Sequence, residues 1–110
     1  MAKYLFRANY VGDGLKGLMA EGGSKRREAA RAAIESAGGT LESFYYAFGD
    51  VDAYVIVDLP SAANAVATAA AVAVSGTGSV ETVVLIEPET VDEAAKIHPE
   101  YRAPGEIASH

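Results

Sequence analysis

Residues 40–59, TLESFYYAFGDVDAYVIVDL, decide the fold. Two runs rich in aromatic and β-branched residues, 40–48 and 51–59, flank Gly49-Asp50, a spacing typical of a tight antiparallel hairpin. Because side chains alternate along a strand, this register assigns every residue to one of two faces. The face packed under helices is predicted to hold Phe44, Tyr46, Phe48, Val51, Ala53, Val55 and Val57. The opposite face is predicted to hold Leu41, Ser43, Tyr45, Ala47, Asp52, Tyr54 and Ile56.

Segments on either side of the hairpin complete an α+β fold. Residues 3–10 alternate between two faces and predict a first strand, and residues 79–87 predict a fourth. Residues 25–37 and 62–74 predict two helices between these strands. The order is β-α-β-β-α-β, the ferredoxin-like arrangement, in which both helices cover one face of an antiparallel four-stranded sheet.

Local signals indicate where the helices begin and end. Ser24 is predicted to cap the first helix, and Gly38-Gly39 to end it. At most a short helical turn is expected around residues 15–20. Thr90 and Glu93 have the spacing of a capping box and predict a short last helix.

We assign residues 1–97 to a single domain and residues 98–110 to an extended C-terminal arm that either wraps a neighbour or is disordered. Each of the two histidines, His98 and His110, is interpreted as an ordinary surface side chain.

Composition excludes several classes of function. The net charge of −6 argues against nucleic-acid binding, which needs a basic surface. The chain has no cysteine and only two, distant histidines, so we predict no metal site, and no cofactor is implied. The most apolar run, residues 65–74, is too short to cross a membrane and is expected in a folded core. We expect a cytoplasmic protein, because no signal-peptide pattern precedes the first strand.

The pattern of apolar residues predicts self-association. The sheet face opposite the helices is too apolar for open water, and the fourth strand is apolar on both faces. The second helix lacks the polar outer stripe of a surface helix. We therefore expect a homo-oligomer, a dimer or higher.

The sequence resembles the GYD family of small bacterial and archaeal proteins. The resemblance centres on Gly49-Asp50-Val51-Asp52 and its two flanking strands, and the stretch 22–27 is similar to another recurrent segment of the family. Val51 stands where the namesake motif has its usual tyrosine. The resemblance covers roughly the first 90 residues and implies a dimeric α/β barrel-type association, but no particular activity.

Two segments near the first helix suggest ligand binding. Residues 12–17 match G-x-G-x-x-G, but the acidic residue that a dinucleotide site needs about 20 positions later would fall inside a helix, so we interpret these glycines as turns. Lys25, Arg26 and Arg27 place three cations at the positive end of the first helix. They are candidates to bind an anionic ligand or an acidic patch of a neighbouring subunit, and the alternative is solvation or pairing with Glu28.

A second set of candidates lies on the uncovered sheet face. Arg7, Asn9, Tyr45, Asp52 and Tyr54 are candidate ligand-binding residues there, beside Ser43 and Glu81. Four of them, Asp52, Tyr54, Tyr45 and Arg7, are also candidates for proton-transfer catalysis. The competing interpretation is a polar network within an interface.

Three functions remain open at this point. The first is a homo-oligomeric domain that binds a small anionic or aromatic ligand in an interface cleft. The second is a cofactor-independent enzyme of the small dimeric-barrel type, an isomerase or a monooxygenase. The third is a structural assembly subunit. A cleft of at least about 300 Å³ favours the first two functions.

Overall fold

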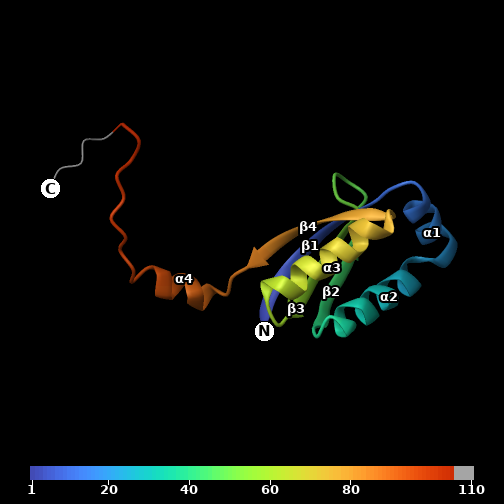
Figure 1. Ribbon diagram of the computed structural model, residues 1–110, viewed down its shortest axis with the longest axis horizontal. Coiled ribbons are helices and arrows are strands. Elements are labelled where there is room, and N and C mark those ends of the chain that lie inside the picture. The colour runs from blue at the N-terminus through green and yellow to red at the C-terminus, as the bar shows by residue number, and fades with distance from the viewer. Residues whose placement is uncertain (106–110) are drawn as a thin grey trace.

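The computed structural model describes residues 1–105, which form an antiparallel sheet with two long helices on one face (Figure 1). The strands are β1 (Ala2–Tyr10), β2 (Thr40–Tyr46), β3 (Ala53–Leu59) and β4 (Gly78–Leu85). The helices are α1 (Asp13–Glu21), α2 (Gly23–Ser36), α3 (Ala62–Ser75) and α4 (Pro88–Ala94). His110 and the rest of residues 106–110 of the predicted arm lie outside the described residues.

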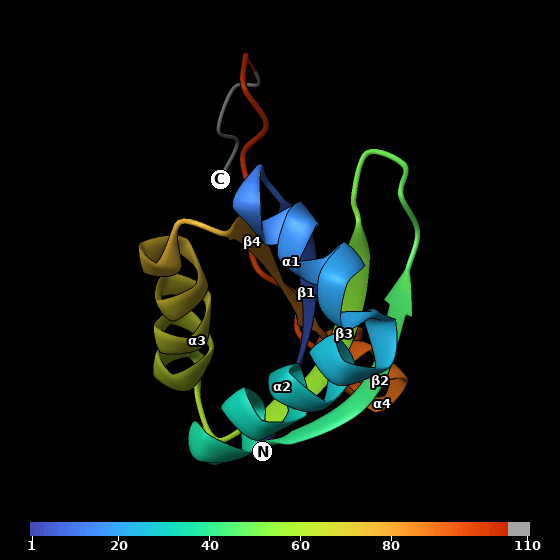
Figure 2. The same cartoon turned by 90° about the vertical axis from the view of Figure 1, so that its right-hand side faces the viewer.

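The sheet confirms the predicted ferredoxin-like α+β fold. Its strand order is β2-β3-β1-β4, and every neighbouring pair is antiparallel. Helices α2 and α3 connect the strands on the same side of the sheet (Figure 2). Within residues 1–105, α1 and α4 extend the order to β-α-α-β-β-α-β-α.

The hairpin has the predicted register but a longer loop. Tyr46 pairs with Ala53 and Phe44 with Val55, as alternation about Gly49-Asp50 requires. The strands end earlier than predicted, so residues 47–52 form an irregular loop instead of a tight turn. Phe48 lies in this loop with φ 55° and is 55% exposed, so its predicted place in the core is wrong.

A β-bulge changes the face of one predicted residue. Leu41 pairs with Val57 whereas Ser43 pairs with Ile56, so β2 carries one extra residue at Glu42. The extra residue rotates Leu41 onto the helix-covered face, where it is buried. The prediction that Leu41 lies on the open face with Ser43 is therefore wrong.

The core fills the space between the sheet and the two long helices. Val57 and Leu59 of β3 are completely buried, and Ile34 of α2 and Ala65 of α3 pack onto the same cluster. The other buried members of the cluster are Tyr4, Phe6, Leu41 and Val55. The covered face is thus the alternate set of strand residues that the hairpin register predicts.

The helix ends differ from their predicted positions. Helix α2 begins at Gly23, and Gly22 with φ 89° occupies the cap position predicted for Ser24. The turn expected around residues 15–20 is a full nine-residue helix, α1. Helix α4 begins at Pro88, whose fixed φ suits a first helical position, so Thr90 lies inside the helix and caps nothing.

Two segments are more exposed than the sequence predicts. Helix α3 packs along β4, and Ala65 is its only buried residue, so the expectation of a core helix is wrong for the single chain. Val66 and Val74 are 64% and 87% exposed. After β4 the chain leaves the sheet, and α4 lies apart from the sheet and its two long helices (Figure 1). No helix in residues 1–105 combines the length and the apolar character that a membrane span needs.

Candidate functional site

A groove of about 500 Å³ separates α2 from α3 above the sheet. Helix α2 packs on β2 and α3 packs on β4, so the two helices lie over opposite edges of the same sheet face (Figure 2). Phe6, Ala8, Ala53 and Val55 of the two central strands form its floor. The groove therefore lies on the helix side of the sheet, not on the open face where the sequence predicts a cleft.

Alanines keep the groove open. The wall from α2 includes Ala29, Ala30 and Ala33 beside the larger Ile34, and the wall from α3 includes Ala67 and Ala71 beside Val72. A methyl side chain is too short to reach across to the opposite helix, so a gap remains between the two helices, although the floor side chains of Phe6 and Val55 are only 4% and 6% exposed. Interiors are normally filled to crystal-like density, and an apolar space of this size is the usual volume of a small-molecule site.

One end of the groove is polar. Arg26 from α2 lines it together with Asn9 and Tyr10, which end β1. The antiparallel pairing of Tyr10 with Gly78 brings the start of β4 to the same end. Three hydroxyl side chains from this region also line the groove, Ser75, Thr77 and Ser79.

Tyr46 lies close to this polar end. Its hydroxyl donates a hydrogen bond to the carbonyl oxygen of Gly23 at 3.0 Å. Burial, and secondarily the neighbouring Tyr10, raises the pKa of Tyr46 to about 12. The phenol is therefore neutral at physiological pH and acts as a hydrogen-bond donor, not as a base.

The glycines of residues 12–17 shape the connection beside this end. Gly12 has φ 41°, a left-handed conformation, and Gly14 packs directly against the backbone oxygen of Thr77, leaving no room for a side chain. The nitrogen of Val11 also donates to the Thr77 oxygen at 3.1 Å. The first two glycines thus serve a turn and a close packing contact.

The three candidate cations of α2 lie in different surroundings. Arg27 Nε lies 3.0 Å from Glu28, and Arg26 lies 4.0 Å from Glu21. Hydrogen bonds from Arg27, and then from Arg31, lower the pKa of Glu28 below its usual value. Lys25 is exposed. Only Arg26 lines the groove among these three.

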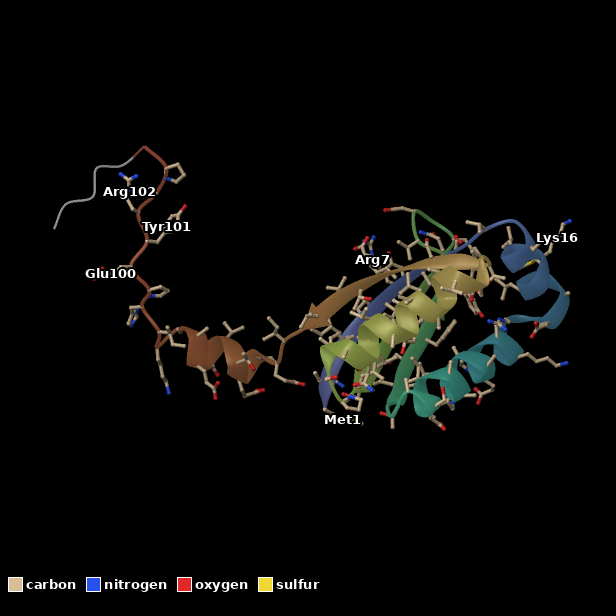
Figure 3. The ribbon with its side chains drawn as sticks, viewed as in Figure 1. Met1, Arg7, Lys16, Glu100, Tyr101 and Arg102 are labelled. Atoms are coloured by element: carbon tan, nitrogen blue, oxygen red, sulfur yellow. The ribbon has the colours of Figure 1, made fainter. Side chains whose placement is uncertain are left out.

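On the open face, three of the predicted residues form one row across the sheet. Tyr45 pairs with Tyr54, Tyr54 with Arg7, and Arg7 with Glu81. Arg7 Nη1 lies 2.8 Å from Glu81 Oε1, on the side of β4 away from α2 (Figure 3). Glu81, and more weakly Tyr54, raises the pKa of the Arg7 guanidinium. The row is a chain of polar contacts with exposed ends, because Tyr45 is 70% exposed.

Asn9 and Asp52 are not part of this row. The backbone nitrogen of Tyr10 donates to the Asp52 carboxylate at 2.9 Å, and the backbone nitrogen of Asp52 donates to Asn9 Oδ1 at 3.2 Å. These bonds fix the corner where the hairpin loop meets β1. The structure thus brings Arg7, Tyr45 and Tyr54 together. Asn9 and Asp52 lie apart from them, and their side chains accept hydrogen bonds from backbone nitrogens.

The groove itself is the feature that sequence reasoning missed. The stripe Ala30, Ala33, Ile34 and Ala37 is interpreted from the sequence as a core-facing stripe, and only Ile34 of this stripe is buried. The available signal is the large share of alanines on the facing sides of both helices. Within residues 1–105, no three His, Cys, Asp or Glu side chains gather as metal ligands.

Comparison with known proteins gives a family without an activity. No curated protein and no solved structure matches the chain. The GYD domain matches residues 4–95, from Tyr4 in β1 to the residue that follows α4. This span includes the sheet, the groove and all the candidate residues described above. The chain therefore belongs to the GYD domain family.

Proposed function

We propose that this chain is a homo-oligomeric GYD domain that binds a small anion with an apolar body in the groove between α2 and α3. The observation that carries the proposal is the groove of about 500 Å³, walled by alanines and lined by Arg26 at its polar end. Ligand sites are typically apolar cavities with a few polar groups that fix orientation. The groove has this composition.

The charge of the ligand follows from the polar end. Arg26 presents a planar guanidinium whose donors match a carboxylate or a similar oxyanion. Its contact with Glu21, at 4.0 Å, is at the outer limit of an ion pair, so the side chain can turn to a ligand at little cost. The hydroxyl group of Ser79 adds a donor at the same end, whereas Ser75 donates to the carbonyl oxygen of Val72 and Thr77 bonds to Ser75.

The body of the ligand follows from the floor and walls. Phe6 and Val55 offer a flat apolar surface, and the alanine methyls add nothing that could hydrogen-bond along the length of the groove. An aliphatic chain or a single aromatic ring fits these surroundings.

The open sheet face is the proposed contact between copies. Leu5, Ile56 and Val83 lie on it around the Arg7–Glu81 pair and are only partly covered by their neighbours in one chain. Packing two such faces together gives the dimeric barrel-type association that the family resemblance implies. Several hundred Å² of apolar surface at about 25 cal/mol per Å² would supply on the order of 10 kcal/mol before the costs of association.

Filling the groove tests the proposal. Octanoate and 3-phenylpropionate are suitable probes, and isothermal titration calorimetry measures their affinity. Ala71→Phe places a ring in the groove, whereas Ala70→Phe adds the same ring on the neighbouring exposed position that does not line it. We expect Ala71→Phe to weaken binding about tenfold or more and Ala70→Phe to leave it unchanged.

Removing the charge tests the role of Arg26. Arg26→Gln should weaken carboxylate binding about tenfold or more, whereas Arg27→Gln, whose side chain pairs with Glu28, should not. The corresponding neutral amides should bind weakly to all variants. If neither probe binds the unmodified protein, or if both arginine variants behave alike, the proposed site is wrong and a structural assembly role is favoured.

A further inference from the structure

The segment after β4 extends away from the sheet and exposes apolar side chains. Every residue from Ile86 to Arg102 is exposed, and the labelled residues Glu100, Tyr101 and Arg102 lie far from the sheet (Figure 3). Four apolar side chains of this segment, Ile86, Val91, Ile97 and Tyr101, are between 60% and 77% exposed. An apolar segment held in open water gains stability when a partner covers it.

The charge of this segment identifies the kind of surface that would cover it. Helix α4 and the residue before it carry four carboxylates, Glu87, Glu89, Asp92 and Glu93. Helix α2 has the opposite character, because its first nine residues carry four cations and one acid, Glu28. Lys25, Arg26 and Arg27 lie in the first turns of α2, where the helix dipole is also positive, so they raise a local potential that an acidic partner would lower.

The spacing of the charges also matches. Glu89 and Glu93 are four residues apart and share one face of α4, and Arg27 and Arg31 share one face of α2 in the same way. Glu28 now lies at 3.0 Å from Arg27 and 3.1 Å from Arg31, so two guanidinium groups share a single carboxylate. Each arginine therefore has donors for a second carboxylate.

The two helices of one chain do not meet. Helix α2 packs on β2 at one edge of the sheet, whereas the arm leaves from the end of β4 at the other edge and points away (Figures 1 and 2). We propose that α4 and the following arm dock on the outer face of α2 of a second copy, with Glu89 and Glu93 against Arg27 and Arg31. This contact is independent of the ligand groove and adds to the proposed sheet-to-sheet interface.

Cross-linking between two single-cysteine chains tests the contact directly, because the protein has no cysteine of its own. One chain carries Thr90→Cys on α4, and an isotope-labelled chain carries Ser24→Cys on α2. After the two full-length chains are mixed, a short bismaleimide should join them, and mass spectrometry identifies the product. A labelled chain with Val74→Cys, on the exposed outer side of α3, is the matched control.

Charge reversal shows whether the pairing is the one proposed. Glu89→Lys with Glu93→Lys in the Thr90→Cys chain should slow cross-linking to Ser24→Cys about tenfold, because like charges then face each other. Adding Arg27→Glu with Arg31→Glu to the Ser24→Cys chain should restore the rate. All four positions are on the surface, and circular dichroism checks that the variants fold.

The proposal is overturned by any of three results. The Ser24→Cys chain could cross-link no faster than the Val74→Cys control, the product could join only two copies of the same cysteine variant, or the reversed charges could fail to restore a lost rate. A rate that is restored only by the complementary pair supports the proposed contact.

Discussion

The two faces of the sheet are built by the same strands and differ in what completes them. On the covered face, Phe6, Val55 and Val57 are no more than 6% exposed because α2 and α3 lie over them. On the open face, Tyr54 is 36% exposed, and Arg7 and Glu81 pair across the strands. One chain thus covers one face of its sheet with helices and leaves the other face uncovered. The alternation of residues along a strand does not show what covers each face.

Neighbouring residues of β3 give the sharpest test of this difference, since Val57 faces the helices and Ile56 faces away. Val57→Asp puts a carboxylate without a partner into a fully buried position. The expected loss of several kcal/mol approaches the whole stability of a small domain, so the variant should be largely unfolded by circular dichroism. A cooperative thermal transition close to that of the unmodified protein would contradict the assignment of this face as the core.

Ile56→Asp makes the same change one residue away on the open face. The charge stays accessible to water in a single chain, so the secondary structure should remain while the assembly dissociates. Light scattering at micromolar concentration should give the mass of a monomer for Ile56→Asp and a multiple of it for the unmodified protein. A monomer mass for the unmodified protein would remove the proposed interface.

The alkaline range tests the surroundings of Tyr46 on the covered side of the sheet. Its pKa is raised to about 12 in the folded protein from about 10 in the unfolded chain, so the stability it contributes is fully present below pH 10 and is lost as the pH rises towards 12. The loss is on the order of 1–2 kcal/mol. Chemical denaturation at pH 9 and pH 11.5 should show a smaller decrease in the free energy of unfolding for Tyr46→Phe. An equal decrease in the free energy of unfolding of both proteins would show that Tyr46 is not the group with the raised pKa.

The smallest effect is expected for the ion pair of the open face. Glu81 is 64% exposed, so a double-mutant cycle of Arg7→Ala and Glu81→Ala in the monomeric Ile56→Asp background should give a coupling free energy below about 1 kcal/mol. Denaturation with urea measures all four proteins. A larger coupling in the assembled, unmodified background is expected if a second copy covers the pair. Coupling above about 2 kcal/mol in the monomer would mean that the open face is already protected within one chain.

Local alternation predicts the fold because each strand must place its apolar set on one side. The register about Gly49-Asp50 and the covered set led by Val55 and Val57 follow from this rule alone. The rule fails at Leu41, where one extra residue in β2 rotates the strand. A bulge needs no distinctive residue at Glu42, so the sequence offers no sign of it.

The candidate site is less predictable because it depends on the distance between two helices. The sequence identifies Arg26 as a candidate, from the unusual charge at the start of α2, but pairs it with Lys25 and Arg27, which do not line the groove. Polar strand residues such as Arg7 and Tyr54 attract attention in a sequence, whereas alanines do not. Here the alanines leave space between the helices, and the polar residues of the open face contact one another.

An NMR titration of the full-length, isotope-labelled protein with octanoate tests most directly which face binds a ligand. Binding in the groove predicts saturable shifts at the backbone amides of Arg26, Ala33 and Ala71, which line the groove, and no comparable shifts at Tyr45 and Tyr54. Ala71→Phe should abolish the shifts. Saturable shifts confined to the row of Tyr45, Tyr54 and Arg7 would contradict binding in the groove and place the binding site on the open face of the sheet.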